Sequence, residues 1–143
     1  MKVIAGVVLL VSVALVAAGG SSHRTSAQLR ERMAVAARRL ARAMNDSLPA
    51  DSAQVYGPAS YRVALHAWSA AAQPLRRSTG RWYVIVVRGR FVWYGPFRPA
   101  RGSFAARLWS PTTGNSGIGY SGLSRRLPPS ISRLGRPALV NLR

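Results

Sequence analysis

The sequence predicts an α+β protein with an N-terminal hydrophobic helix, followed by one amphipathic helix packed on a small antiparallel β-meander. Three observations predict this class: an apolar run at the N-terminus, an apolar stripe at helical spacing after it, and a long β-rich run at residues 82–94. The chain has 143 residues, which allow one hydrophobic core but not two.

The N-terminal segment has the order of charge and hydropathy that is typical of export. Lys2 precedes an apolar run over residues 3–18, and small residues follow it at 19–22. We predict a signal peptide or uncleaved membrane anchor over 1–18, a linker over 19–24, and a single basic domain over 25–143. A helix over 3–18 would span roughly 24 Å, short of a ~30 Å hydrocarbon core. The arginines behind it favour an internal C-terminus if it stays in the membrane. Cleavage and export, an anchor with the domain outside, and an anchor with the domain inside therefore remain open.

Residues 25–45 carry the strongest helical pattern. Thr25 and Gln28 fit a capping box, and an apolar stripe follows at spacings of three and four, formed by Leu29, Met33, Ala36, Leu40 and Met44. Arginines lie on the opposite side. The helix either lays this basic face on an anionic membrane or nucleic acid, or packs its stripe on a sheet and leaves the arginines in solvent.

The middle of the chain predicts a loop and then strands. Residues 46–60 contain Pro49, Gly57 and Pro58 and indicate a connecting loop. Residues 61–68 fit a strand, although a helix is also compatible. Residues 82–94 predict one long strand, bent or bulged at Gly89, because a tight turn would force Arg88 to positive φ. We expect a core face and a partly exposed face: the core face has Tyr83, Ile85, Val87, Phe91 and Trp93, and the partly exposed face has Trp82, Val84, Val86, Arg88, Arg90, Val92 and Tyr94.

The C-terminal part completes the predicted meander. We expect a proline-broken loop over 95–102, a strand through Phe104 and Leu108, a turn over 111–115 and a returning strand over 116–120. Pro128-Pro129 predicts a short helix that ends at Gly135. Residues 138–142 predict a closing strand.

The order of motifs over residues 82–140 resembles a known group of proteins. It runs from Arg88-Gly89-Arg90-Phe91 through the Thr113-Gly114 turn to Gly122-Leu123-Ser124 and Leu134-Gly135. This order is similar to that of uncharacterised small exported proteins of high-GC actinobacteria, and its strand–Thr-Gly–strand part resembles half of a PepSY-type module. Ser110-Pro111 stands where the PepSY-like pattern carries an aspartate. The resemblance implies an extracytoplasmic α+β domain.

Composition excludes several kinds of chemistry. The chain has no cysteine, two histidines (His23 and His66), and three acidic residues at Glu31, Asp46 and Asp51. Disulfides, thiolate zinc sites and cysteine nucleophiles are therefore excluded. Residues 117–122 match G-x-G-x-x-G, but prolines follow within seven residues and no acidic residue comes after, so a dinucleotide site is not expected. We predict no enzyme activity, no cofactor and no metal.

The arginine excess carries the functional prediction. The formal charge is +18, and residues 52–143 hold 14 arginines without one carboxylate side chain. Guanidinium groups suit phosphate or carboxylate, and flat rings offer stacking surfaces. The alternative is that the rings form the core while the arginines solvate the surface. The candidate anion-binding residues are Arg38, Arg39, Arg42, Arg81, Arg88, Arg90, Arg98 and Arg101, and the candidate aromatic platform is Trp82, Tyr94 and Phe97.

Two functions follow as hypotheses. The first is an extracytoplasmic, non-enzymatic module, secreted or held by a single-pass anchor, whose residues 3–18 meet the membrane and which associates electrostatically with anionic lipid or acidic polymer of the cell envelope. The second is a membrane-anchored protein that faces the cytoplasm and binds nucleic acid.

Overall fold

The computed structural model describes residues 26–44, 51–71, 79–112 and 121–143. The chain divides into two units, Met1–Arg32 and Met33–Arg143. In the first unit, residues 26–32 are helical. The predicted hydrophobic helix, the linker and Thr25 lie outside the described residues. Within those ranges no helix is both long enough and apolar enough to span a membrane.

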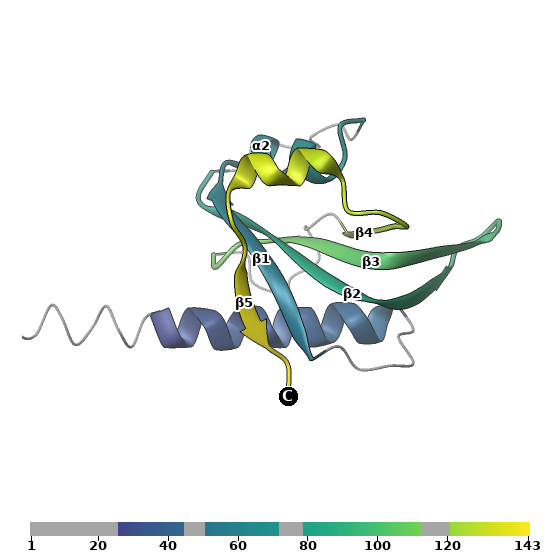
Figure 1. Ribbon diagram of the computed structural model, residues 1–143, viewed down its shortest axis with the longest axis horizontal. Coiled ribbons are helices and arrows are strands. Elements are labelled where there is room, and N and C mark those ends of the chain that lie inside the picture. The colour runs from purple at the N-terminus through teal and green to yellow at the C-terminus, as the bar shows by residue number, and fades with distance from the viewer. Residues whose placement is uncertain (1–25, 45–50, 72–78, 113–120) are drawn as a thin grey trace, which may run out of the picture. The chain divides into compact units, whose positions relative to one another are not determined.

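The second unit is built on a five-stranded antiparallel sheet with the strand order β4-β3-β2-β1-β5 (Figure 1). Its strands are β1 (Ser52–Ala59), β2 (Trp82–Tyr94), β3 (Pro99–Trp109), β4 (Ser121–Ser124) and β5 (Ala138–Asn141). Strands β1 to β4 form a meander, whereas β5 returns to pair with β1 at the other edge. The predicted α+β class is confirmed, because a helix packs on this sheet.

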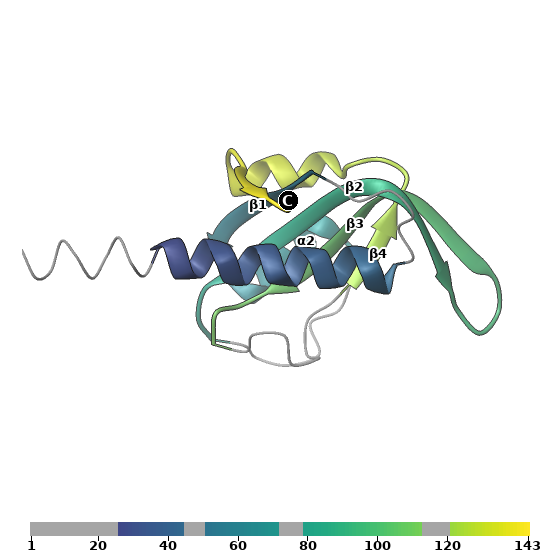
Figure 2. The same ribbon diagram turned by 90° about the horizontal axis from the view of Figure 1, so that it is seen from below.

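One face of the sheet is covered by the helical residues 33–43 (Figure 2). Met33, Ala36, Leu40 and Met44 of the predicted stripe are buried. The Val92 backbone N–H of β2 donates to the Met44 carbonyl at 3.1 Å and fixes the end of this segment against the strand. The stripe therefore packs on the sheet, as the second interpretation of the helix predicts.

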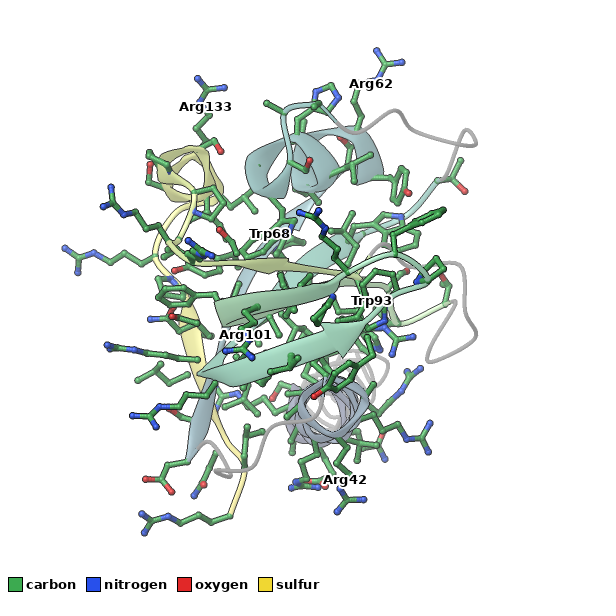
Figure 3. All side chains as sticks on the ribbon, turned by 90° about the vertical axis from the view of Figure 1, so that its right-hand side faces the viewer. Arg42, Arg62, Trp68, Trp93, Arg101 and Arg133 are labelled. Atoms are coloured by element: carbon green, nitrogen blue, oxygen red, sulfur yellow. The ribbon has the colours of Figure 1, made fainter. Side chains whose placement is uncertain are left out.

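The opposite face is covered by α2 (Tyr61–Trp68) and by the 3-10 helix η1 (Pro129–Leu134) (Figure 1). Together they bury one apolar cluster, formed by Tyr56, Ala64, Leu65, Trp68, Trp82, Val84, Val86, Ala106, Leu108 and Ile131. Figure 3 shows Trp68 between α2 and the sheet. Ser130 Oγ donates to the Ala67 carbonyl at 2.7 Å and joins the two helices.

The loop predicted over residues 46–60 is wrong in its described part, because residues 52–59 form β1. Of the two structures that were compatible with residues 61–68, the chain forms the helix and not the strand. Strand β1 tolerates Gly57 and Pro58 because they lie where its register with β2 shifts, between Tyr56 and Ala59. Ser60 caps the start of this helix, because its Oγ accepts a hydrogen bond from the Val63 N–H at 3.4 Å.

The prediction for residues 82–94 is confirmed as one strand with an irregularity near Gly89, and the predicted core face is confirmed at the buried residues Tyr83, Ile85, Val87 and Phe91. The assignment of faces is wrong at Trp93 and at three residues of the other face. Trp82, Val84 and Val86 are fully buried, because α2 and η1 cover the face that was expected to be partly exposed. Trp93, which was expected in the core, is half exposed. Both faces of the sheet are thus covered along the first half of β2.

The remaining predictions are confirmed in part. Strand β3 includes the predicted strand residues but already begins at Pro99, so the loop predicted over 95–102 ends earlier. The returning strand predicted over 116–120 lies outside the described residues, and the strand that pairs with β3 is β4. The short helix after Pro128 and the closing strand are confirmed as η1 and β5.

Candidate anion-binding groove

The β2–β3 hairpin carries most of the predicted site residues. Its outer part, residues 88–102, is here called the hairpin arm, and it extends past the ends of the other strands (Figures 1 and 2). Arg88 pairs with Phe104 and Phe91 pairs with Gly102, so two residues of β2 stand opposite Ser103 alone. This arrangement is a β-bulge, which increases local twist and redirects side chains.

An open groove of about 560 Å³ lies at the base of the hairpin arm. Val92 and Arg101 are a cross-strand pair and share one face of the ribbon. Ser103 lies two residues from Arg101, so its side chain is on that same face. The groove is lined by Arg90, Phe91, Val92, Arg101, Gly102, Ser103 and Arg125. We call it the arginine groove.

The third arginine enters from the turn after β4. Ser124 Oγ donates to the Arg126 carbonyl at 2.5 Å and accepts from the Arg126 N–H at 3.3 Å, which fixes the turn that carries Arg125. Gly102 lets this turn approach β3, since a Cβ there would lie 2.9 Å from the Ser124 carbonyl oxygen and 3.0 Å from the Ser124 nitrogen. Arg125 therefore reaches the groove because position 102 has no side chain.

No acidic residue is among the described residues that line the arginine groove. Asp51 forms an exposed ion pair with Arg143, with 2.9 Å between Arg143 Nε and Asp51 Oδ1. Hydrogen bonding by Arg143 lowers the pKa of Asp51, so this carboxylate stays ionised and paired with Arg143. Arg90, Arg101 and Arg125 all line one groove, and arginine side chains offer planar donors to a phosphate or a carboxylate.

The other predicted arginines do not gather at this groove. Arg88 and Arg98 are exposed on the hairpin arm, while Arg81 lies at the other end of β2. Arg38 is half-buried, and its Nε donates to the Leu142 carbonyl at 3.3 Å, which is a structural role. Arg39 and Arg42 are exposed on the helix. In Figure 3, Arg42 points away from the sheet on one side, and Arg62 and Arg133 point away on the other.

The aromatic platform is only partly as predicted. Trp82 is buried, and its ring packs edge-on to Tyr61 at 4.8 Å between centroids, so it offers no surface for stacking. Tyr94 and Phe97 are exposed, with relative exposures of 72% and 95%. Trp93 was predicted in the core, and Arg125 was not among the predicted site residues. The bulge before Trp93 and the pairing of β4 with β3 determine these two positions. A bulge at Gly89 is expected from the sequence, but its effect on the exposure of Trp93 and the pairing of β4 with β3 leave no local signal.

The structure also locates His66 and the other described side chains that could ligate a metal ion. Among the described residues, no three His, Cys, Asp or Glu side chains cluster in a way that could hold a metal ion, and His66 is exposed on α2. No protein-family model, curated protein or solved structure matches the chain.

Proposed function

We propose that this chain is an exported or membrane-anchored, non-enzymatic module that associates electrostatically with anionic material of the cell envelope, and that it holds phosphate or carboxylate groups in the arginine groove. The observation that carries the proposal is the convergence of Arg90, Arg101 and Arg125 on one groove without an acidic neighbour among the described residues. The apolar run over residues 3–18 supports the envelope location.

The charge of the whole chain favours the same kind of partner. A formal charge of +18 on 143 residues raises the local concentration of polyanions and speeds their encounter with the protein. Overall charge attracts any anion to the surface, whereas the groove would bind one anionic group through several arginines at once. The alternative, a cytoplasm-facing protein that binds nucleic acid, uses the same phosphate chemistry and is one outcome of the test.

The test compares two triple variants of the full chain that lose the same charge. Arg90→Gln/Arg101→Gln/Arg125→Gln removes the groove, and Arg62→Gln/Arg133→Gln/Arg136→Gln removes three exposed arginines of α2, η1 and the segment after η1. Co-sedimentation is measured with anionic and zwitterionic vesicles, from about 0.01 M to about 1 M salt, over which the Debye length falls from about 30 Å to about 3 Å. Residues 3–18 carry no charged side chain, so their binding to lipid does not depend on lipid charge. Their contribution therefore cancels when binding to zwitterionic vesicles is subtracted from binding to anionic vesicles.

We expect the wild type to prefer anionic vesicles at low salt and to lose this preference at high salt. The groove variant should lose at least about tenfold in this preference, or about 1.4 kcal/mol, and the control variant should lose much less. Equal losses would mean that overall charge, not the groove, holds the anion. Groove-dependent binding of a single-stranded oligonucleotide that exceeds vesicle binding would favour the nucleic-acid alternative.

A further inference from the structure

The outer end of the hairpin arm carries a second feature beside the arginine groove. Five large apolar side chains are exposed among the described residues, and three of them lie here. Trp93, Tyr94 and Phe97 have relative exposures of 50%, 72% and 95%, and they form what we call the aromatic tip. The other two, Val63 and Leu139, stand singly on α2 and β5, as scattered surface apolar residues commonly do.

The aromatic tip is held away from the rest of the sheet by regular pairing. Trp93 pairs with Ala100 and Tyr94 pairs with Pro99, so the strands stay joined up to the four-residue connection Gly95–Arg98. The hydrogen bond from the Val92 N–H to the Met44 carbonyl fixes the base of the arm to the helix. The rings are therefore presented on a paired ribbon rather than on a long unpaired loop.

The directions of the rings indicate what kind of partner fits. Trp93 and Tyr94 are successive strand residues, so their side chains leave opposite faces of the ribbon, and Phe97 lies in the connection between the strands. A flat protein partner would cover one face and leave the other ring in water. A surface entered end-on would take up all three rings at once, and a lipid bilayer is such a surface.

The charges around the tip fit an anionic bilayer. Arg98 lies in the connection, and Arg90 and Arg101 lie behind the rings on the same arm. Aromatic side chains favour the interface between headgroups and acyl chains, and arginines beside them contact the phosphates just above. Rings at the end of the arm, with Arg90 and Arg101 behind them, match the order of layers in a bilayer.

We propose that the aromatic tip inserts into the interface of an anionic lipid bilayer while the arginine groove holds lipid headgroups. This inference rests on the proposed function and identifies its partner as membrane lipid rather than a soluble acidic polymer. Insertion is reversible and shallow, because three rings on one hairpin bury far less apolar surface than a membrane-spanning segment.

The four tryptophans give a direct test. Trp68, Trp82 and Trp109 are buried and only Trp93 is exposed, and residues 1–18 contain no tryptophan. Fluorescence quenching by anionic vesicles with brominated acyl chains therefore reports on the tip, even if residues 3–18 also bind lipid. We expect quenching of the full-length wild type and none in Trp93→Phe.

Phe97→Ser tests the energetic role of the tip without a change of charge. It should need about tenfold more lipid for half-maximal quenching, which corresponds to about 1.4 kcal/mol. Leu139→Ser removes an exposed apolar side chain from β5, at 69% relative exposure, and should leave the titration unchanged. Equal effects of the two substitutions would overturn the proposal.

The outcomes separate this inference from the function on which it rests. Groove-dependent preference for anionic vesicles without quenching of Trp93 would overturn insertion and leave the proposed function intact. No preference for anionic vesicles would overturn the proposed function itself. A lipid-free dimer that Phe97→Ser dissociates, seen by sedimentation equilibrium together with absent quenching, would make the tip a contact between copies and would also overturn insertion.

Discussion

Gly57 occupies a position in β1 that no other residue fits without strain. Its φ of 115° lies in the region that side chains disfavour, and a Cβ there would lie 2.8 Å from the Trp82 carbonyl oxygen. Gly135, after η1, also has a positive φ, of 85°, but a Cβ there would meet nothing within 4 Å. The two glycines therefore share a backbone requirement and differ in steric contact.

Alanine substitutions at these two positions separate the two effects. Gly57→Ala should lower the free energy of unfolding by about 2–4 kcal/mol, from backbone strain plus the displacement of the start of β2. Gly135→Ala should cost less, about 1–3 kcal/mol, from strain alone, because its φ of 85° and ψ of −163° lie in a region that is essentially restricted to glycine. Urea denaturation followed by circular dichroism measures both. Equal losses would show that contact with Trp82 contributes nothing.

At the scale of elements, α2 shows how packing selects between two compatible local structures. Alternate positions in residues 61–68 are apolar, as in a strand, but Leu65 and Trp68 are also three apart. In the helix, Ala64, Leu65, Ala67 and Trp68 are all buried against the sheet and η1. The sequence of residues 61–68 does not show that η1 will pack against them, since η1 lies more than sixty residues later. The choice between strand and helix therefore depends on tertiary contact.

Leu65 and Val63 make a matched pair within α2. Leu65 is 1% exposed in the cluster with Trp82 and Val84, whereas Val63 is 50% exposed. Leu65→Ala should reduce the free energy of unfolding by about 2–5 kcal/mol because it leaves a cavity. Val63→Ala should change it by less than about 0.5 kcal/mol. Urea melts of the two variants provide the measurement, and a tolerant Leu65→Ala would contradict the packing of α2 described above.

Elements also determine how far the site could be predicted from the sequence. Arg90 and Arg101 were selected because arginines and rings alternate in residues 81–101, a local pattern. Arg125 was missed because only the pairing of β4 with β3 and the close approach at Gly102 bring it to the groove. Trp82 was misassigned because periodicity separates two faces of a strand but does not reveal that both are covered.

At the scale of the whole molecule, the excess of positive charge does not change with pH. Arginine stays protonated across the accessible pH range, so the repulsion among these groups does not titrate away. The one acidic group with a lowered pKa, among those described, is Asp51 beside Arg143. Its stabilising contribution is present above its unfolded pKa and is lost as the pH falls through the lowered pKa. Because both side chains are exposed, that loss is small.

Salt should therefore affect the stability of this chain more than pH does. Two like charges 10 Å apart in water repel by about 0.4 kcal/mol, and salt screens such pairs. We expect the free energy of unfolding in urea to rise by the order of 1 kcal/mol between about 0.01 M and about 0.15 M sodium chloride. Arg62→Gln/Arg133→Gln/Arg136→Gln should be more stable than the wild type at low salt and should gain less from added salt. If the wild type is equally stable at both salt concentrations, the arginines are spaced widely enough to avoid mutual repulsion. The attraction to anionic partners would then depend on the arginine groove alone.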